Sequence, residues 1–168
     1  GTYWMKHLTE IEIRSKPLSE FWMNPAYRIP AGLFPTVDHF PTQETAANQP
    51  ITDIVVNSLV TSIHDGQRVT RGQMVDVAGV AWDGGRGIRD VEVSTDGGSS
   101  WVLAQLGKDL GRLSFRTFMH KFRVGAGDAP IVMVRAINQR GDVQSAKLIL
   151  NPAGYHHNVI PRIRLEVA

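Results

Sequence analysis

The chain has 168 residues, of which 42% are hydrophobic and 20% charged, with a net charge of +2 and no cysteine. This length and composition are typical of a globular domain with its own core. The lack of cysteine excludes disulfides and thiolate ligands within the chain. The small net charge, without any basic run, argues against a nucleic-acid partner. No stretch approaches the roughly 20 apolar residues of a membrane span, and none resembles a signal peptide.

Residues 1–50 are predicted to form an extended, proline-rich segment. Within residues 1–13 the positions expected to face inward are Tyr3, Met5, Leu8, Ile11 and Ile13. Residues 15–50 contain six of the nine prolines, and proline fixes φ and removes a hydrogen-bond donor. Because this stretch also carries five aromatic residues, it differs from ordinary disorder. Such a segment is usually a linker, a strap across a partner surface or a functional loop, and its aromatic residues lead us to expect that it lies on another surface.

The centre of the chain, residues 75–101, is predicted to form strands joined by tight turns. Apolar residues alternate with others from Val75 to Trp82, which is the period of a strand. Asp-Gly-Gly at 83–85 and again at 96–98 tolerates positive φ, and Asp-Gly between two strand-like runs is a strong hairpin signal. Trp82 and Trp101 are expected to anchor the sheet, with a partner for each indole N–H that is buried.

The rest of the chain has the same β-type pattern. Further strands are expected within 51–59, 113–122, 131–137, 143–150 and 159–167, with a turn at 138–142. No amphipathic helix is predicted. About seven short strands separated by turn signals predict an all-β fold, an immunoglobulin-like β-sandwich over residues 51–168 that follows the segment 1–50.

No self-contained active site is predicted. The six histidines are dispersed, apart from His156 and His157, which in a strand would point to opposite faces and could not chelate one metal together. No His-x-x-x-His motif and no cluster of carboxylates predicts a metal site. The glycine pairs do not open a helix, so they do not predict a phosphate-binding loop.

Two motifs stand out, Gly-Val-Ala-Trp-Asp-Gly-Gly at 79–85 and Val-Glu-Val-Ser-Thr-Asp-Gly-Gly-Ser-Ser-Trp at 91–101. The segments that accompany them are 56–61, 114–118, 135–138, 142–144, and 151–155 with Asn158. Taken together, these segments resemble the C-terminal dimerisation domain of the sulfite oxidase family of molybdenum enzymes. The resemblance implies an immunoglobulin-like sandwich that forms a homodimer. It also implies that the molybdopterin cofactor and its cysteine ligand lie in a preceding domain, which this chain lacks.

The resemblance extends to the N-terminal segment. Residues 3–8 resemble the end of the family's cofactor domain, which implies that Lys6 helps to hold the cofactor as a cation near its phosphate. Residues 22–28 resemble the segment that bears the family's active-site tyrosine. Tyr27, at 27 − 6 = 21 positions after Lys6, is therefore the candidate catalytic residue. The resemblance implies that it donates a hydrogen bond to a metal-bound oxygen or to the sulfite. Its alternative role is to pack a loop, and Arg28 is the candidate substrate-binding residue.

One departure from the family concerns the substrate. Where animal-type members carry an arginine that reaches the substrate anion, this chain has Ala153, so a bidentate guanidinium contact would be lost. Arg28, Arg162 or an arginine of the missing domain could replace it. The substrate therefore stays open between sulfite and another sulfur compound. The pattern resembles bacterial members, which implies a periplasmic enzyme that passes electrons to a c-type cytochrome.

We therefore predict the C-terminal dimerisation part of a molybdenum-dependent, sulfite oxidase-like oxidoreductase, inactive as a fragment. Its molybdenum–molybdopterin cofactor would be bound mainly by the missing domain. The alternative is a free-standing immunoglobulin-like binding module, in which residues 15–50 bind a partner. The first interpretation predicts self-association and an apolar surface on the first 50 residues, whereas the second predicts a monomer with an ordered N-terminal third.

Overall fold

The computed structural model describes residues 6–30, 48–125, 129–148 and 154–168. The chain divides into two compact units, which we describe separately. Unit 1 contains Gly1–Ile54 and Ile149–His157, and unit 2 contains Val55–Leu148 and Asn158–Ala168. Among the described residues, no helix is long and apolar enough to cross a membrane.

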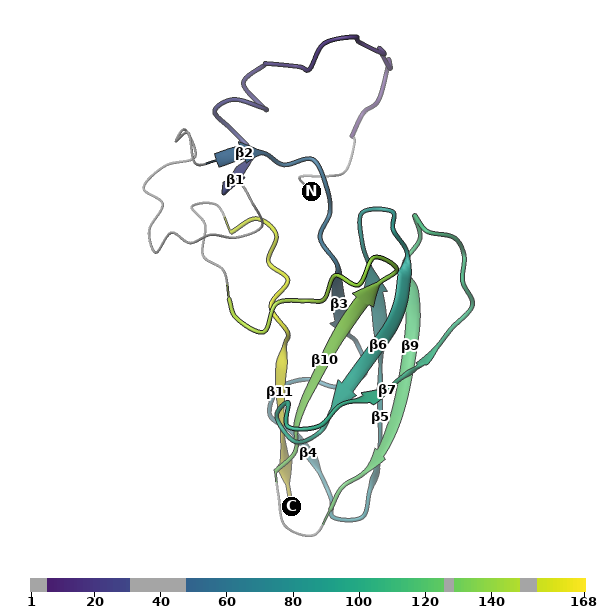
Figure 1. The fold of residues 1–168 in the computed structure, drawn as a ribbon. Coiled ribbons are helices and arrows are strands. Elements are labelled where there is room, and N and C mark those ends of the chain that lie inside the picture. Colours follow the sequence, from purple (N-terminus) through teal and green to yellow (C-terminus); the bar gives the residue numbers. More distant parts are fainter. Residues whose placement is uncertain (1–5, 31–47, 126–128, 149–153) are drawn as a thin grey trace. The chain divides into compact units, whose positions relative to one another are not determined.

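The described residues contain eleven strands and no helix (Figure 1). The strands are β1 (Arg28–Pro30), β2 (Asn48–Pro50), β3 (Asn57–Val60), β4 (Gln67–Val69), β5 (Met74–Trp82), β6 (Ile88–Ser94), β7 (Val102–Leu103), β8 (Gln105–Leu106), β9 (Arg116–Arg123), β10 (Ile131–Asn138) and β11 (Arg162–Val167). The first two pair with each other in unit 1. The other nine form the two sheets of unit 2.

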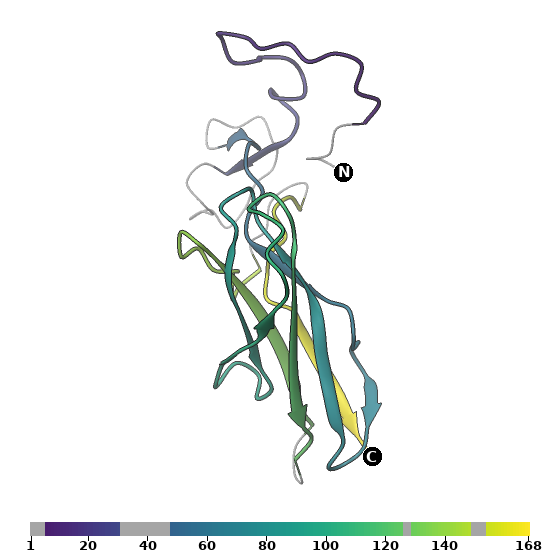
Figure 2. The same cartoon turned by 90° about the vertical axis from the view of Figure 1, so that its right-hand side faces the viewer.

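Unit 2 is a β-sandwich, seen from two sides in Figure 1 and Figure 2. One sheet has the strand order β4-β11-β10-β6-β7, and the other has the order β3-β5-β9-β8. Neighbouring strands in both sheets are antiparallel, except for the parallel pair β11 and β4. Buried side chains of both sheets meet in one core, which includes Val77, Val93, Val134 and Leu165. The predicted all-β sandwich is confirmed.

The strands form where the sequence alternates between apolar and other residues. In β11, Ile163 and Leu165 are buried, whereas Arg162, Arg164 and Glu166 between and beside them are exposed. Successive side chains of a strand point to opposite faces, so this pattern directs one face to the core and the other to solvent. The sequence pattern therefore fixes which face of this sheet packs inward.

Gly79 allows β5 to approach its neighbours closely. A Cβ atom at this position would lie 2.0 Å from the backbone oxygen of Leu59 in β3 and 2.7 Å from Cζ of Phe118 in β9. The buried Phe118 ring therefore occupies the space above the glycine, and any side chain here would displace it. This packing accounts for the glycine in the middle of β5.

The two predicted Asp-Gly-Gly turns are confirmed. Oδ1 of Asp83 accepts the backbone N–H groups of residues 85, 86 and 87, each at 3.0 Å. The carboxylate of Asp96 accepts hydrogen bonds from the Ser100 hydroxyl at 2.5 Å, the Ser100 N–H at 2.9 Å and the Ser94 hydroxyl at 2.7 Å. These bonds, with that of the Ser100 hydroxyl first, hold the pKa of Asp96 well below the ordinary range. Gly85 and Gly97 have φ of 99° and 73°, a region that favours glycine.

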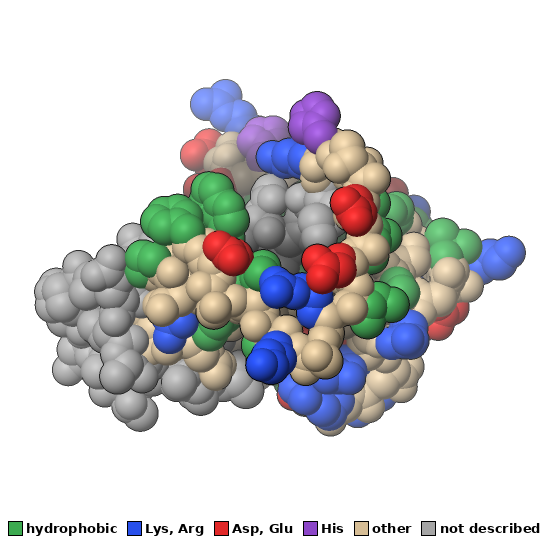
Figure 3. Space-filling model, turned by 90° about the horizontal axis from the view of Figure 1, so that it is seen from above, with side chains coloured by type: hydrophobic (Ala, Val, Ile, Leu, Met, Phe, Trp, Pro, Cys, Tyr) green, Lys and Arg blue, Asp and Glu red, His purple; other side chains and the backbone are tan. Residues whose placement is uncertain are grey.

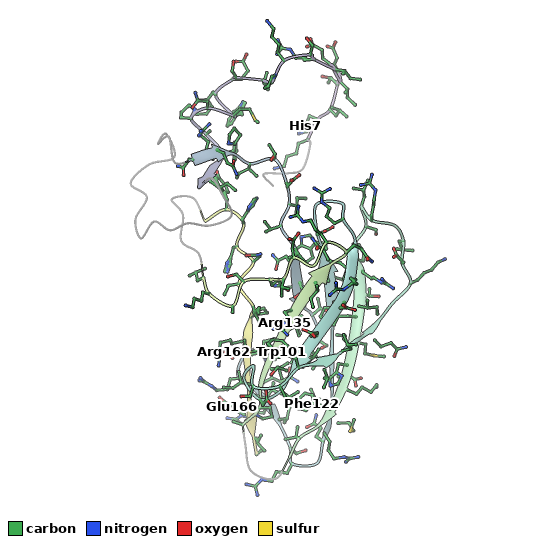
Figure 4. The ribbon with its side chains drawn as sticks, viewed as in Figure 1. His7, Trp101, Phe122, Arg135, Arg162 and Glu166 are labelled. Carbon is green, nitrogen blue, oxygen red and sulfur yellow. The ribbon has the colours of Figure 1, made fainter. Side chains whose placement is uncertain are left out.

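Trp101 is an anchor, as predicted, and its indole N–H is satisfied. The Nε1 group donates to the Gly98 carbonyl at 3.1 Å. The guanidinium carbon of Arg135 lies 4.1 Å from the ring centroid, a cation–π arrangement. Arg162 donates to the Met133 sulfur beside it at 3.5 Å, and Figure 4 shows Arg162, Arg135 and Trp101 together along β10.

Two local predictions are wrong. Residues 143–148, the described part of the predicted strand 143–150, form only isolated bridges at Val143 and Ser145. In residues 6–13, no strand forms, and Leu8, Ile11 and Ile13, which we expected to face inward, are exposed, Ile13 at 97%. Both stretches carry apolar residues, but neither finds a neighbouring strand with which to form a continuous ladder.

Gln144 explains why residues 143–148 can lie beside β10 without forming a strand. β11 pairs with β10 only at residues 131–133. Beyond them, the Ala136 N–H donates to Oε1 of the buried Gln144 at 2.7 Å, and the Ser58 hydroxyl donates to the same oxygen at 2.7 Å. Nε2 of Gln144 donates to Oδ1 of Asn57 at 3.0 Å. One side chain thus replaces a strand at this edge and joins β10 to β3 of the other sheet.

Candidate functional site

Tyr27, the predicted catalytic residue, follows a compact turn in unit 1. The Met23 and Asn24 N–H groups donate to the Glu20 carbonyl at 2.8 and 2.9 Å, and the Asn24–Pro25 peptide bond is cis. Tyr27 itself has φ of 48°, a left-handed conformation that is uncommon for a residue with a side chain. The Tyr27 carbonyl accepts the Ile51 N–H at 2.9 Å, so the backbone on its C-terminal side is held in place.

Arg28, the predicted substrate-binding residue, lies in β1 and ties the turn to β2. Its Nη1 donates to the Met23 carbonyl at 3.1 Å, and its Nη2 donates to the Asn48 carbonyl. Arg28 pairs with Pro50 in the short β1–β2 sheet. These contacts use part of the guanidinium fork to hold two backbone segments together. They show a structural role for Arg28, and its binding of substrate stays a prediction.

The side chain of Tyr27 lies in a row of aromatic rings. The Phe21 and Trp22 centroids are 5.0 Å apart, Trp22 and Tyr27 are 5.6 Å apart, and Tyr27 and Tyr155 are 5.6 Å apart. These separations lie in the range of favourable aromatic pairs. Tyr155 comes from the distant segment 154–157, which joins unit 1 here. The row, which we call the aromatic row, holds the half-buried Tyr27 ring between two others.

The ionisation of the residues beside Tyr27 reflects their partial burial. Burial, followed by the neighbouring Tyr27 phenol, raises the pKa of Tyr155 above its ordinary value of 10.0. Burial lowers the pKa of His156, which favours the neutral imidazole. Tyr155 therefore remains a neutral phenol at physiological pH.

Lys6 and Arg162, two other predicted site residues, are not part of the aromatic row. Lys6 is exposed, in the irregular stretch 6–19 that contains no strand. Ala153 lies outside the described residues. Arg162 belongs to unit 2, where it lies beside Met133. The structure thus brings together Tyr27 and Arg28, which are adjacent in sequence, and adds Tyr155 to them.

The chain's own residues do not fit a molybdenum–molybdopterin group by themselves. The chain has no cysteine to supply a thiolate ligand, and in the described part no three His, Asp or Glu side chains gather where they could hold a metal. Lys6 offers a cation and Tyr27 a phenol, neither of which ligates such a group through sulfur.

Tyr155 and Trp22 are the residues of this site that sequence analysis did not single out. Trp22 begins the segment 22–28 that resembles the family's tyrosine-bearing segment, and this position could have indicated that it lies near Tyr27. Tyr155 belongs to the segment 151–155, which formed part of the family resemblance, but no local pattern connects it with Tyr27. Only the folded chain brings the two tyrosine rings together.

The chain is similar in sequence to known sulfite oxidases. Human mitochondrial sulfite oxidase is 28% identical over 100% of this chain, and Arabidopsis thaliana sulfite oxidase is 31% identical over 67% of it. The chain spans 31% and 28% of the lengths of these two relatives. The crystal structure of the sulfane dehydrogenase SoxCD from Paracoccus pantotrophus matches 91% of this chain and 40% of that one, with a TM-score of 0.60 and 21% identity.

The match to SoxCD shows a shared fold. The model of the Mo-co oxidoreductase dimerisation domain family matches residues 48–168, which include all of β3 to β11 and therefore the complete sandwich. These residues make up more than half of the chain. The chain therefore belongs to the Mo-co oxidoreductase dimerisation domain family.

Proposed function

We propose that the chain is the dimerisation part of a molybdenum-dependent, sulfite oxidase-type oxidoreductase. The observation that carries this proposal is the family match over residues 48–168, which covers the whole sandwich. The relatives that match the chain from end to end are about three times its length, so the proposed enzyme includes a further domain that holds the cofactor. The family match supports this function over a free-standing binding module.

The proposal includes a substrate, an electron acceptor and a compartment. The substrate is sulfite or a related sulfur compound. Position 153 carries alanine, so the bidentate arginine contact that would select a small sulfur oxyanion is missing there, and both classes of substrate are to be tested. The name sulfane dehydrogenase, carried by the SoxCD protein of the same fold, is one reason to test sulfur compounds other than sulfite. The acceptor is a c-type cytochrome and the compartment is the periplasm, both by resemblance to bacterial members.

Unit 1 would form one wall of the active site next to the cofactor domain. Its described residues expose six large apolar side chains, namely Leu8, Ile11, Ile13, Leu18, Phe21 and Trp22. Figure 3 shows hydrophobic side chains exposed beside charged ones on the face seen there. Exposed apolar groups in this number favour contact with another protein surface. In such an enzyme Lys6 would bind the cofactor phosphate, Tyr27 would donate a hydrogen bond to the substrate, and Arg28 would attract its negative charge.

The test uses a longer polypeptide that contains this chain. Molybdenum content is measured by mass spectrometry, and turnover is measured as sulfite-dependent reduction of cytochrome c. Tyr27→Phe should lower kcat about 100-fold or more, the usual contribution of a positioned proton donor. Tyr155→Phe is the matched control, because it removes a hydroxyl from the stacked neighbour. The control should keep kcat within about twofold of the parent, because the substituted ring can still pack against Tyr27.

Each outcome has a distinct meaning. Stoichiometric molybdenum with a selective loss in Tyr27→Phe would support both the enzyme and the role of Tyr27. Molybdenum without turnover of sulfite, but with turnover of another sulfur compound, would support the enzyme and show that sulfite is not its substrate. A polypeptide without molybdenum or a cofactor domain would contradict the enzyme proposal.

A further inference from the structure

The backbone is strained on both sides of the ring pair that Tyr27 and Tyr155 form. Tyr27 itself has φ of 48°, and His156, next to Tyr155, has φ of 57°. Among the described residues, three positions other than glycine have positive φ, and these are two of them. Such conformations are unfavourable for a residue with a side chain, and they persist where the surrounding structure fixes them, most often at functional sites. The strain therefore points to a function of this pair beyond ordinary packing.

The rings on the two sides of Tyr27 are held in different ways. Trp22 is 59% exposed and belongs to the same turn, 27 − 22 = 5 positions before Tyr27. Tyr155 is half-buried and comes from a segment 155 − 27 = 128 positions after Tyr27. Its ring centroid lies 5.6 Å from that of Tyr27, with an interplanar angle of 39°. Trp22 therefore moves with the turn, whereas Tyr155 ties Tyr27 to a part of unit 1 outside that turn.

The ring contacts bear on the direction of the Tyr27 side chain. The Tyr27 carbonyl accepts the Ile51 N–H at 2.9 Å, and this bond fixes the backbone without determining the side-chain torsions. Among the described residues, the rings that contact Tyr27 are those of Trp22 and Tyr155. Where a hydrogen bond acts on a reacting group, a displacement of about 1 Å can cost about 100-fold in rate. What holds the phenol in place therefore matters as much as the phenol itself.

We propose that Tyr155 is a positioning residue whose ring fixes the direction of the Tyr27 phenol. The inference rests on the proposed role of Tyr27 as a hydrogen-bond donor to the substrate, and it adds the residue that holds this donor. The contact is made by the ring of Tyr155. Burial raises the pKa of Tyr155 above its ordinary value of 10.0, so the residue carries no charge at physiological pH. Phenylalanine should therefore replace Tyr155 in this role, whereas alanine should not.

The first test measures turnover in the longer polypeptide that contains this chain. Tyr155→Ala should lower kcat at least about 10-fold and change KM less than about threefold, because it weakens an interaction made in the transition state. Tyr155→Phe keeps the ring and should keep kcat within about twofold of the parent. Phe115→Ala is the matched control, because it removes a 53% exposed ring from unit 2. It should also keep kcat within about twofold.

A double variant separates positioning from a general loss of structure. Because Tyr155 acts through the Tyr27 hydroxyl, it has nothing to position once that hydroxyl is removed. Adding Tyr155→Ala to Tyr27→Phe should therefore lower kcat by less than about a further twofold. A general loss of structure would instead lower kcat by the same factor in both backgrounds. Circular dichroism confirms that each variant remains folded.

The second test requires no turnover. Tyrosine with a single fluorine on its ring is incorporated at position 27 of the same polypeptide, and its fluorine NMR spectrum distinguishes the two orientations of that ring. A ring that is held should give unequal resonances, whereas a freely turning ring should give one averaged resonance. The parent, Tyr155→Phe and Phe115→Ala should show the held ring. Tyr155→Ala should show the averaged resonance.

The outcomes distinguish this proposal from the proposed function. A polypeptide without molybdenum or turnover would contradict the proposed function, and an averaged fluorine resonance in the parent would overturn the positioning by Tyr155. A loss of turnover in Tyr27→Phe, with kcat of Tyr155→Ala unchanged, would keep the role of Tyr27 and overturn that of Tyr155. Equal losses in Tyr155→Phe and Tyr155→Ala would show that the hydroxyl acts, which also overturns the proposal. Multiplied losses in the double variant would overturn it in favour of a structural role.

Discussion

Replacing Gln144 by alanine should destabilise the sandwich more than any other single removal of a polar side chain described above. Gln144 is buried and joins both sheets, through Ala136 of β10 on one side and Ser58 and Asn57 of β3 on the other. Gln144→Ala would leave the Ala136 N–H and the Ser58 hydroxyl without their acceptor in a buried setting. The effect should therefore exceed the loss of a surface hydrogen bond.

The expected magnitude follows from the three strong bonds of the side chain. Two of them measure 2.7 Å and one 3.0 Å, and each contributes about 1 kcal/mol to stability. Gln144→Ala should thus lower the free energy of unfolding by about 3 kcal/mol. For a chain of this size, such a loss corresponds to a fall of about 6–12 °C in Tm.

Urea unfolding followed by far-UV circular dichroism measures the change directly. The protein concentration must be the same for all variants, because self-association would add to the apparent stability. Gln105→Ala is the matched control, since Gln105 is an exposed glutamine in β8, and it should change stability by less than about 0.5 kcal/mol. A loss below about 1 kcal/mol in Gln144→Ala would refute the argument that this side chain replaces a strand at the edge of β10.

Three further predictions concern other features. Gly79→Ala should lower the free energy of unfolding by about 3 kcal/mol or more, or prevent folding, because its Cβ would lie 2.0 Å from a backbone oxygen; Gly125→Ala, with open space around it, is the control. Asp96→Ala should lower the Tm by less than Gln144→Ala does. The pKa of Asp96 is lowered mainly by its hydrogen bond from Ser100, so in the parent the contribution of Asp96 to the free energy of unfolding should be present above pH 3.8 and be lost as the pH falls below it. In a tyrosine titration at high pH, Tyr155→Phe should remove the phenol that ionises late; since its pKa is raised in the folded state, its contribution to stability is complete below pH 10.0 and declines above it. A parent in which all phenols titrate together would contradict the last prediction.

The sandwich could be predicted because its strands alternate clearly and its turns carry their own signals. β5 and β6 follow from a period of two residues, and Asp83 and Asp96 each close a turn through their own carboxylates. Residues 143–148 have a similar apolar content, yet they form no strand. What decides between the two cases is Gln144, whose side chain takes the Ala136 N–H that a strand would have used. A local sequence pattern does not reveal that a side chain will take the place of a neighbouring strand.

The site could be predicted only in part. Lys6, Tyr27 and Arg28 came from the resemblance to a family, and spacing alone would not have selected them. The place of Tyr155 in the site was not predicted, because a contact between rings of two distant segments cannot be inferred from a local sequence pattern. The hydrogen bond of Arg28 to the Asn48 carbonyl was not predicted either, because it depends on the pairing of β1 with β2.

The two units differ in what stabilises them, and this difference bears on function. Every residue of the main core cluster belongs to unit 2, whereas Ile29 is the one buried hydrophobic residue of unit 1 among those the structure describes. Burial of apolar surface is the main force that stabilises a folded chain. The described residues of unit 1 bury little apolar surface among themselves, so this force contributes little to their order. That order depends on the aromatic row and on the Arg28 contacts. A segment with so small a core and so many exposed apolar side chains favours a partner surface, which is where a catalytic Tyr27 would have to act.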